Sequence, residues 1–220
     1  MVEFLIEFLR TLTDPEKLRA FLTTVMSGWW AYALLFAIVF AETGLLVGFF
    51  LPGDSLLFTV GVVAGAGDLN VLMITAALIV AAIVGDAVGY MLGRQAGPHV
   101  FTQRSRFFKQ EHLLTTKAFY EKHGGKTIIY ARFVPIVRTF APFVAGVAQM
   151  PYSRFAAFNV FGGIGWVALL VFAGYFLGNV PFVRAHFEKV IFGIIIVSVL
   201  PVVIEYMKHR RAAPESVPVE

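Results

Sequence analysis

The chain has 220 residues, of which 58% are apolar and only 15% charged, with no cysteine and a net charge of +4. Soluble domains are typically about 45–50% apolar and about 25% charged, so the excess of apolar surface indicates a membrane protein. The lack of cysteine excludes disulfides and thiolate chemistry, and basic residues grouped beside apolar segments leave no footprint for nucleic-acid binding.

The N-terminal residues 1–28 mix apolar and charged side chains at a spacing typical of an amphipathic helix on a membrane surface. Within them, Asp14 is expected to cap a helix whose first turn contains Pro15. No basic stretch precedes an apolar core with a cleavage site, so we expect no cleaved secretory signal.

The first long apolar run extends from residue 29 to residue 51 and is long enough to span a membrane. It contains Glu42 and stops at Pro52 and Gly53, and the apolar run after it is too short to span. Because proline and glycine interrupt helices, the pattern predicts a re-entrant helical hairpin near residues 42–66.

A second long run, residues 69–93, is expected to span the membrane and contains Asp86. The polar stretch after it, residues 94–126, holds seven Lys and Arg against two Glu. Because positively charged loops stay in the cytoplasm, this loop is expected on the cytoplasmic side.

The apolar residues 127–150 are interrupted by Pro135 and Pro142, which predicts a second re-entrant hairpin. Residues 155–177 are expected to span the membrane, and residues 190–204 to form a C-terminal transmembrane helix. The tail after this helix is basic, so the C-terminus is also expected in the cytoplasm.

Two stretches of the chain resemble each other at offsets of 81 to 85 residues. The matching features are Pro52 and Pro135, Ala-Gly at 64–65 and 145–146, and Gly-Tyr-x-Leu-Gly at 89–93 and 174–178. A re-entrant hairpin plus one span crosses the membrane once, so the second unit is expected to be inverted relative to the first. The predicted fold is therefore an all-α polytopic membrane protein. An inverted repeat of re-entrant hairpin plus transmembrane helix fills residues 29–178, and an extra C-terminal transmembrane helix with a basic tail fills residues 179–220.

Four charged residues, Glu42, Asp54, Arg132 and Arg138, lie in otherwise apolar stretches. A charge at the bilayer centre costs about 2.5–3.5 kcal/mol on insertion scales, so the two acids are expected to pair with the two arginines. One interpretation is a set of structural ion pairs that join the hairpins. The other is functional: arginine binds phosphate bidentately, and the start of a half-helix favours anions, so Arg132 and Arg138 are candidate ligands of a phosphate-like headgroup.

The two acids have a further candidate role. Burial and a neighbouring arginine shift the pKa of a carboxyl group in opposite directions. The hypothesis is that Glu42 or Asp54 takes up a proton near physiological pH and releases an arginine. Proton movement would then be coupled to anion movement.

Asp86 is a secondary candidate for this network. It lies among glycines four residues apart at 85, 89 and 93, a spacing that favours close helix packing. The histidines lack ligand spacing, so no metal site is predicted, and no nucleophile or phosphate-loop motif is present. We therefore expect no catalytic residue, no cofactor and no enzymatic activity.

Long motifs surround these charges. They are Glu42-Thr43-Gly44, Phe50-Leu51-Pro52-Gly53-Asp54-Ser55-Leu56 and Ala131-Arg132-Phe133-Val134-Pro135-Ile136-Val137-Arg138-Thr139-Phe140-Ala141-Pro142. In these motifs, and over roughly residues 29 to 211, the chain resembles the bacterial DedA family. That family is similar to the eukaryotic VTT-domain lipid scramblases.

The resemblance implies a multi-pass protein of the bacterial cytoplasmic membrane with two re-entrant hairpins. It implies a flippase that translocates undecaprenyl phosphate or a related anionic phospholipid between leaflets. The family's functional acids correspond to Glu42 and Asp54, and its functional arginines to Arg132 and Arg138. The implied partners are membrane lipids and protons, and a homo-oligomer is left open.

Three alternatives stay open at this point. They are a non-selective phospholipid scramblase, a proton-coupled exporter of small solutes, and a membrane lipid phosphatase. The phosphatase ranks last because the sequence lacks a nucleophile–base pair. The sequence leaves the lipid, the direction of transport and the side of the N-terminus undetermined.

Overall fold

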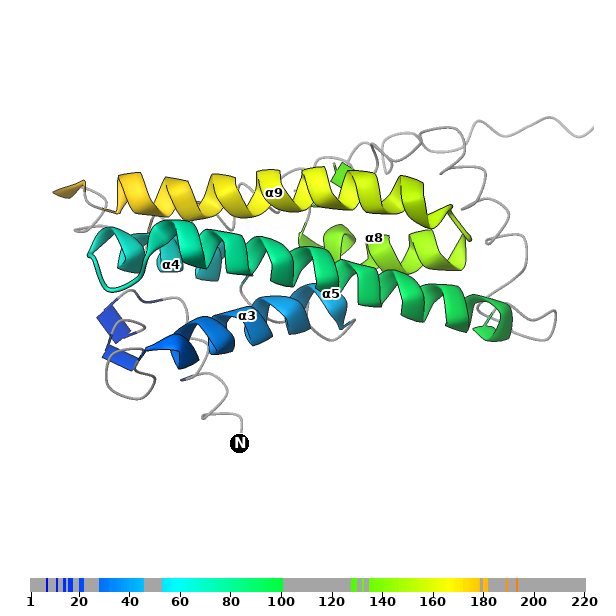
Figure 1. Cartoon of the computed structure of the whole chain (residues 1–220), viewed down its shortest axis with the longest axis horizontal. Coiled ribbons are helices and arrows are strands. Elements are labelled where there is room, and N and C mark those ends of the chain that lie inside the picture. The colour runs from blue at the N-terminus through cyan, green and yellow to red at the C-terminus, as the bar shows by residue number, and fades with distance from the viewer. Residues whose placement is uncertain are drawn as a thin grey trace, which may run out of the picture.

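A computed structural model describes residues 28–45, 53–100, 128–129, 132, 135–178 and 180–181, with isolated residues nearer the two ends (7, 11, 14, 16, 17, 20, 21, 189 and 193). The elements it places are all helices, as predicted. They are α3 (Trp29–Gly44), α4 (Gly53–Gly65), α5 (Val71–Val100), α8 (Pro135–Val147) and α9 (Tyr152–Leu177), shown in Figure 1.

Two of the described helices, α5 and α9, are long and apolar enough to cross a membrane. At a rise of about 1.5 Å per residue, they are roughly 45 Å and 39 Å long. Both present large apolar side chains on their outer faces, among them Leu72 and Met73 on α5 and Phe161 and Phe176 on α9. Such a surface is suited to contact with lipid rather than with water.

Of the shorter helices, α4 lies within the first predicted hairpin at residues 42–66, whereas most of α3 precedes it. Helix α3 ends at Gly44, earlier than the apolar run that continues to residue 51, because Leu45 adopts an extended backbone conformation. Helix α4 begins at Gly53, at the predicted break, and has 13 residues. It is therefore about 20 Å long and cannot cross a membrane alone.

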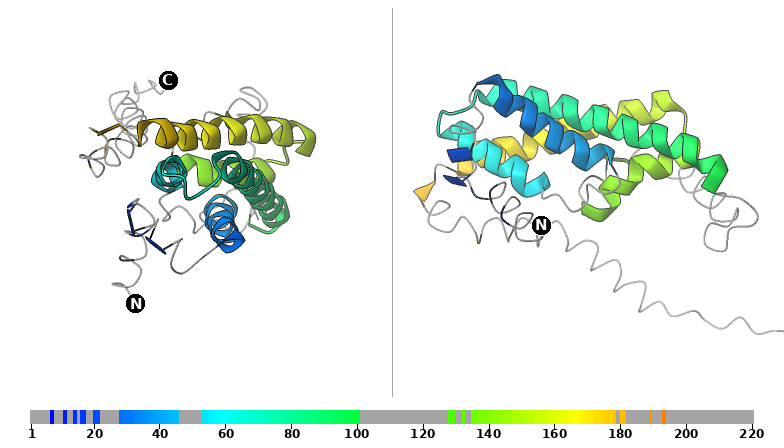
Figure 2. Two further views of the ribbon diagram at one scale, coloured as in Figure 1. Left: turned by 60° about the vertical axis from the view of Figure 1, so that its left-hand side comes forward. Right: turned by 90° about the horizontal axis from the view of Figure 1, so that it is seen from below.

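Two long-range hydrogen bonds join the segments just before α5 and α9 to other helices. At one end, the Tyr32 hydroxyl in α3 accepts from the backbone N–H of Asn70, which precedes α5, at 2.9 Å. In the other half, the Tyr90 hydroxyl in α5 donates to the Met150 carbonyl, just before α9. Helices α4 and α8 lie toward opposite ends of the long helices in Figures 1 and 2.

The packing of the helices is reciprocal between the two halves of the chain. Helix α4 packs along α9, and α8 packs along α5, while α3 also lies against α5. At both seams glycine allows backbones to touch: a Cβ on Gly174 would collide with the Phe58 carbonyl, and one on Gly93 with the Phe143 carbonyl. The close packing predicted from the glycine spacing on α5 is therefore confirmed.

One predicted break is wrong. Pro142 lies inside α8, which continues without interruption to Val147. A proline in a helix removes the hydrogen bond to the carbonyl four residues earlier, here that of Arg138, and its ring crowds that carbonyl. Packed neighbouring helices make such a proline tolerable. The Pro142 ring instead packs near Gly89 of α5.

The remaining predicted elements stand as follows. Asp14 makes the expected N-cap hydrogen bonds: its side chain accepts from the backbone N–H groups of Glu16 at 2.9 Å and Lys17 at 3.2 Å. Pro52, the predicted helix at residues 190–204 and the tail lie outside the described residues, as does most of the segment before residue 28.

Candidate functional site

The first buried cluster centres on Arg138, in the first turn of α8. Its guanidinium bonds two carboxylates at once: Nη1 donates to Asp54, and Nη2 donates to Oε1 of Glu42 at 2.5 Å. Glu42 lies in the last turn of α3 and Asp54 in the first turn of α4. The cluster therefore forms where α3 ends and where α4 and α8 begin, and it joins the two halves of the sequence.

Helix α9 completes this cluster through Trp166. The indole Nε1 donates to Oδ1 of Asp54 at 2.9 Å. The Arg138 guanidinium carbon lies 4.8 Å from the centre of the Trp166 ring, which is within range of a cation–π interaction. Trp166 thus contacts both members of the Arg138–Asp54 pair.

Gly53 has a local role in this site. A Cβ at this position would overlap the Glu42 carboxylate, so only glycine leaves room for the acid at the start of α4. Glu42 is 1% exposed, and its Oε2 has no hydrogen-bond partner among the described residues. Two carboxylates on one guanidinium give the ionised cluster a charge of −1, a costly state away from water.

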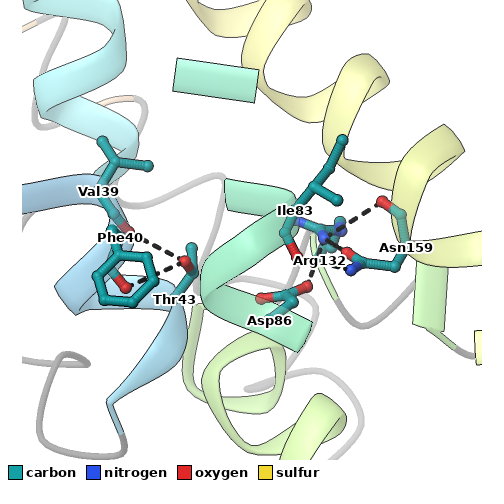
Figure 3. A network of polar contacts seen from close by, with 7 residues as sticks. All are labelled: Val39, Phe40, Thr43, Ile83, Asp86, Arg132 and Asn159. Atoms are coloured by element: carbon teal, nitrogen blue, oxygen red, sulfur yellow. Dashed lines mark hydrogen bonds and ion pairs between the residues drawn. The ribbon is translucent and has the colours of Figure 1, made fainter. Parts of the chain in front are cut away.

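A second buried cluster surrounds Arg132 (Figure 3). Its Nη2 donates to the carboxylate of Asp86 on α5 and to the side-chain oxygen of Asn159 on α9. The Asn159 side-chain amide in turn donates to the Ile83 carbonyl of α5 at 3.0 Å. One arginine faces one carboxylate here, so the ionised pair is neutral.

The charge pattern predicts that Glu42 and Asp54 pair with Arg132 and Arg138, and the structure places both acids on Arg138 alone. Arg132 takes Asp86 instead, so the secondary candidate does join the arginine network. Asn159 and Trp166 were not foreseen. Asn159 left one sequence signal, a polar amide within an apolar span, whereas nothing in the sequence distinguishes Trp166 from ordinary membrane packing.

Within the described part of the chain, no three His, Asp or Glu side chains gather in a group that could hold a metal ion. The two clusters consist of carboxylates, guanidinium groups, an amide and an indole. Such groups can exchange ion-pair partners, protons and anionic ligands.

Comparison of the sequence with known proteins identifies the family of this chain. The model of the VTT domain matches residues 51–176, and Protein DedA of Escherichia coli strain K12 is 56% identical over 189 residues, covering 84% of this chain and 86% of the relative. The chain belongs to the VTT-domain family, that of the bacterial DedA proteins. No solved structure matches it.

Two further relatives are also named as membrane proteins. An uncharacterized membrane protein of Mycobacterium leprae strain TN is 49% identical over 194 residues, covering 84% of this chain and 87% of the relative. Inner membrane protein YghB of E. coli K12 is 36% identical over 161 residues, with 72% and 73% covered. This DedA-family chain is accordingly a membrane protein, in agreement with its apolar helices.

Proposed function

We propose that this DedA-family protein moves an anionic lipid, undecaprenyl phosphate or a related phospholipid, between membrane leaflets in exchange for protons. The observation that carries the proposal is Arg138, held between Glu42 and Asp54 where helices from both halves of the chain meet. Arginine is the side chain best suited to grip a phosphate headgroup.

The charge of this cluster links anion binding to protons. With both acids ionised the cluster carries −1, so an anionic headgroup must displace a carboxylate from Arg138 or arrive after one is neutralised. The Asp54 side chain is 14% exposed and that of Glu42 only 1%. Asp54 is therefore the more accessible of the two acids, and its Oδ1 also accepts from the Trp166 indole N–H.

Helix ends support the same ligand chemistry. Helices α4 and α8 both begin at the cluster, with Asp54 and Arg138 in their first turns. The N-terminal end of a helix carries a partial positive charge that favours anions. In addition, the buried Nε of Arg138 has no hydrogen-bond partner among the described residues.

The membrane arrangement that we propose follows the reciprocal packing. Helices α5 and α9 cross the cytoplasmic membrane, while α3 with α4, and α8, dip in from opposite sides and meet at Arg138. The C-terminus is cytoplasmic in this arrangement. Sites at the meeting point of two inverted units are typical of alternating-access transporters.

The test is transport in liposomes. Purified protein is reconstituted with labelled undecaprenyl phosphate or labelled phosphatidylethanolamine, with and without a proton gradient, and the label reaching the opposite leaflet is measured. We expect faster movement of undecaprenyl phosphate, and a rate that changes with the gradient. Glu42→Gln and Asp54→Asn should each weaken the response to the gradient.

Each alternative gives a different result in the same assay. Equal movement of both lipids without a gradient effect indicates a scramblase, and release of inorganic phosphate indicates a phosphatase. Movement of neither lipid, with proton-driven flux of a small solute, indicates an exporter. Full transport by both acid variants at every pH contradicts the proton coupling.

A further inference from the structure

We propose that the two buried arginines have different jobs: Arg138 alone contacts the headgroup, and Arg132 is a permanent tie that holds α5 and α9 together through Asp86 and Asn159. The assignment rests on the proposed lipid transport and refines it. It makes the site a one-arginine site, selective for a headgroup that a single guanidinium can hold.

The bonds of Arg132 form a closed ring between two helices. Its guanidinium contacts Asp86 on α5 and Asn159 on α9, including the Asn159 carbonyl at 3.4 Å. Asn159 closes the ring by donating to Ile83, one turn before Asp86 on α5. A ligand that took Arg132 would leave Asp86 and Asn159 buried without their partner.

The Arg132 side chain also packs closely against α9. A Cβ on Gly162 of α9 would lie 2.9 Å from the Cδ and Nε atoms of Arg132, and one on Gly163 would lie 3.6 Å from Nη2. The guanidinium and its stem therefore lie directly against the α9 backbone. Although Nε of Arg132 has no hydrogen-bond partner among the described residues, the backbone at Gly162 covers it.

Exposure and charge separate the two arginines. The side chains of Arg132 and Asp86 are both 4% exposed, whereas those of Arg138 and Asp54 are 10% and 14% exposed. Arg132 pairs with one carboxylate, that of Asp86, whereas Arg138 pairs with two. Only the Arg138 cluster is both reachable and unbalanced, as an exchange of partners requires.

Buried ion pairs have a property that tests the assignment. Removing one partner leaves an uncompensated buried charge, whereas removing both charges together leaves none. A structural tie should therefore tolerate the loss of both charges together. A ligand-binding arginine should not, because its ligand still lacks a partner.

The experiment compares Arg132→Gln, Asp86→Asn and the double variant in full-length protein reconstituted in liposomes with labelled undecaprenyl phosphate. Each single change should lower both the folded yield and the transport rate at least tenfold. The double variant should return to within about threefold of the unmodified rate, with an unchanged apparent KM for the lipid. Monodispersity in detergent and the thermal midpoint report folding independently of transport.

Two outcomes overturn the assignment. A double variant that is folded but inactive, or that has a strongly raised apparent KM, shows that Arg132 contacts the lipid. A double variant no more stable than the single variants shows that Arg132 and Asp86 are not a tie. Because stability is read without lipid, this second result stands even if the unmodified protein moves no lipid and the proposed function itself fails.

Discussion

Arg138→Gln is expected to reduce lipid transport by at least tenfold and to destabilise the protein by about 3–5 kcal/mol. The activity falls because the headgroup loses its charged donor, and charge-assisted hydrogen bonds contribute about 1.5–3 kcal/mol each. The stability falls because Glu42 and Asp54 are left as two buried carboxylates without a cation. Transport in liposomes and thermal unfolding in detergent measure the two effects separately.

A triple variant separates ligand binding from folding at this position. Arg138→Gln combined with Glu42→Gln and Asp54→Asn removes every charge of the cluster, so most of the lost stability should return. Transport should not return, because the cation that binds the headgroup is still missing. A stable triple variant that transports lipid at the normal rate would show that Arg138 has a structural role only.

Gly174→Ala is expected to destabilise the protein by about 1–3 kcal/mol, the usual cost of overpacking. The new methyl group would meet the backbone carbonyl of Phe58, which cannot rotate away as a flexible side chain could. Helices α4 and α9 would have to separate, and Asp54 and Trp166 lie on these same two helices. Transport should therefore fall together with the thermal midpoint.

The matched control lies on the same helix. A Cβ at Gly165 of α9 would meet nothing within 4 Å, so Gly165→Ala should leave the thermal midpoint unchanged or slightly raised, since alanine favours a helix over glycine. Equal losses in the two variants would mean that α9 tolerates no added methyl group anywhere. The specific contact with α4 would then not explain the effect.

Much of the site could be predicted because charge in an apolar segment has few explanations. Glu42, Asp54 and Arg138 stand out from their surroundings in the sequence, and the cost of burying them predicts that they pair. The partners of each arginine could not be predicted, because they depend on how helices from different parts of the chain are aligned. Arg138 holds both of these acids, and Arg132 holds Asp86.

The ends of the helices could also not be predicted from the sequence alone. Hydropathy predicted a span that ends at residue 93, but α5 continues to Val100. Loss of hydropathy marks where a segment leaves lipid rather than where a helix ends, and α5 continues through Gly97 and Pro98. Pro142 failed as a break for a related reason, since proline removes one hydrogen bond but contacts with α5 keep α8 intact.

Trp166 shows what pattern alone cannot supply. Tryptophan in an apolar span is ordinary, and its indole N–H acquires a role only because α4 brings Asp54 within 2.9 Å. Gly53 is similar: the sequence marks it as a helix breaker, whereas the structure adds that it makes room for Glu42. Both roles come from contacts between different helices, α4 with α9 for Trp166 and α4 with α3 for Gly53.

The central claim is that the first hairpin enters and leaves the membrane on one side, while the second hairpin meets it from the other. The chain has no cysteine, so single cysteines report sidedness cleanly. Trp29→Cys, Ala66→Cys and Ser153→Cys each replace an exposed residue, at the start of α3, after α4 and at the start of α9.

Labelling of these three variants with a membrane-impermeant maleimide, in intact cells and in inverted vesicles, is the most direct measurement. We predict that the cysteines at 29 and 66 react from the same side and that the cysteine at 153 reacts from the opposite, cytoplasmic side. Reaction of the cysteines at 29 and 66 from opposite sides would make α3 and α4 one continuous span, and would contradict the arrangement on which the transport mechanism depends.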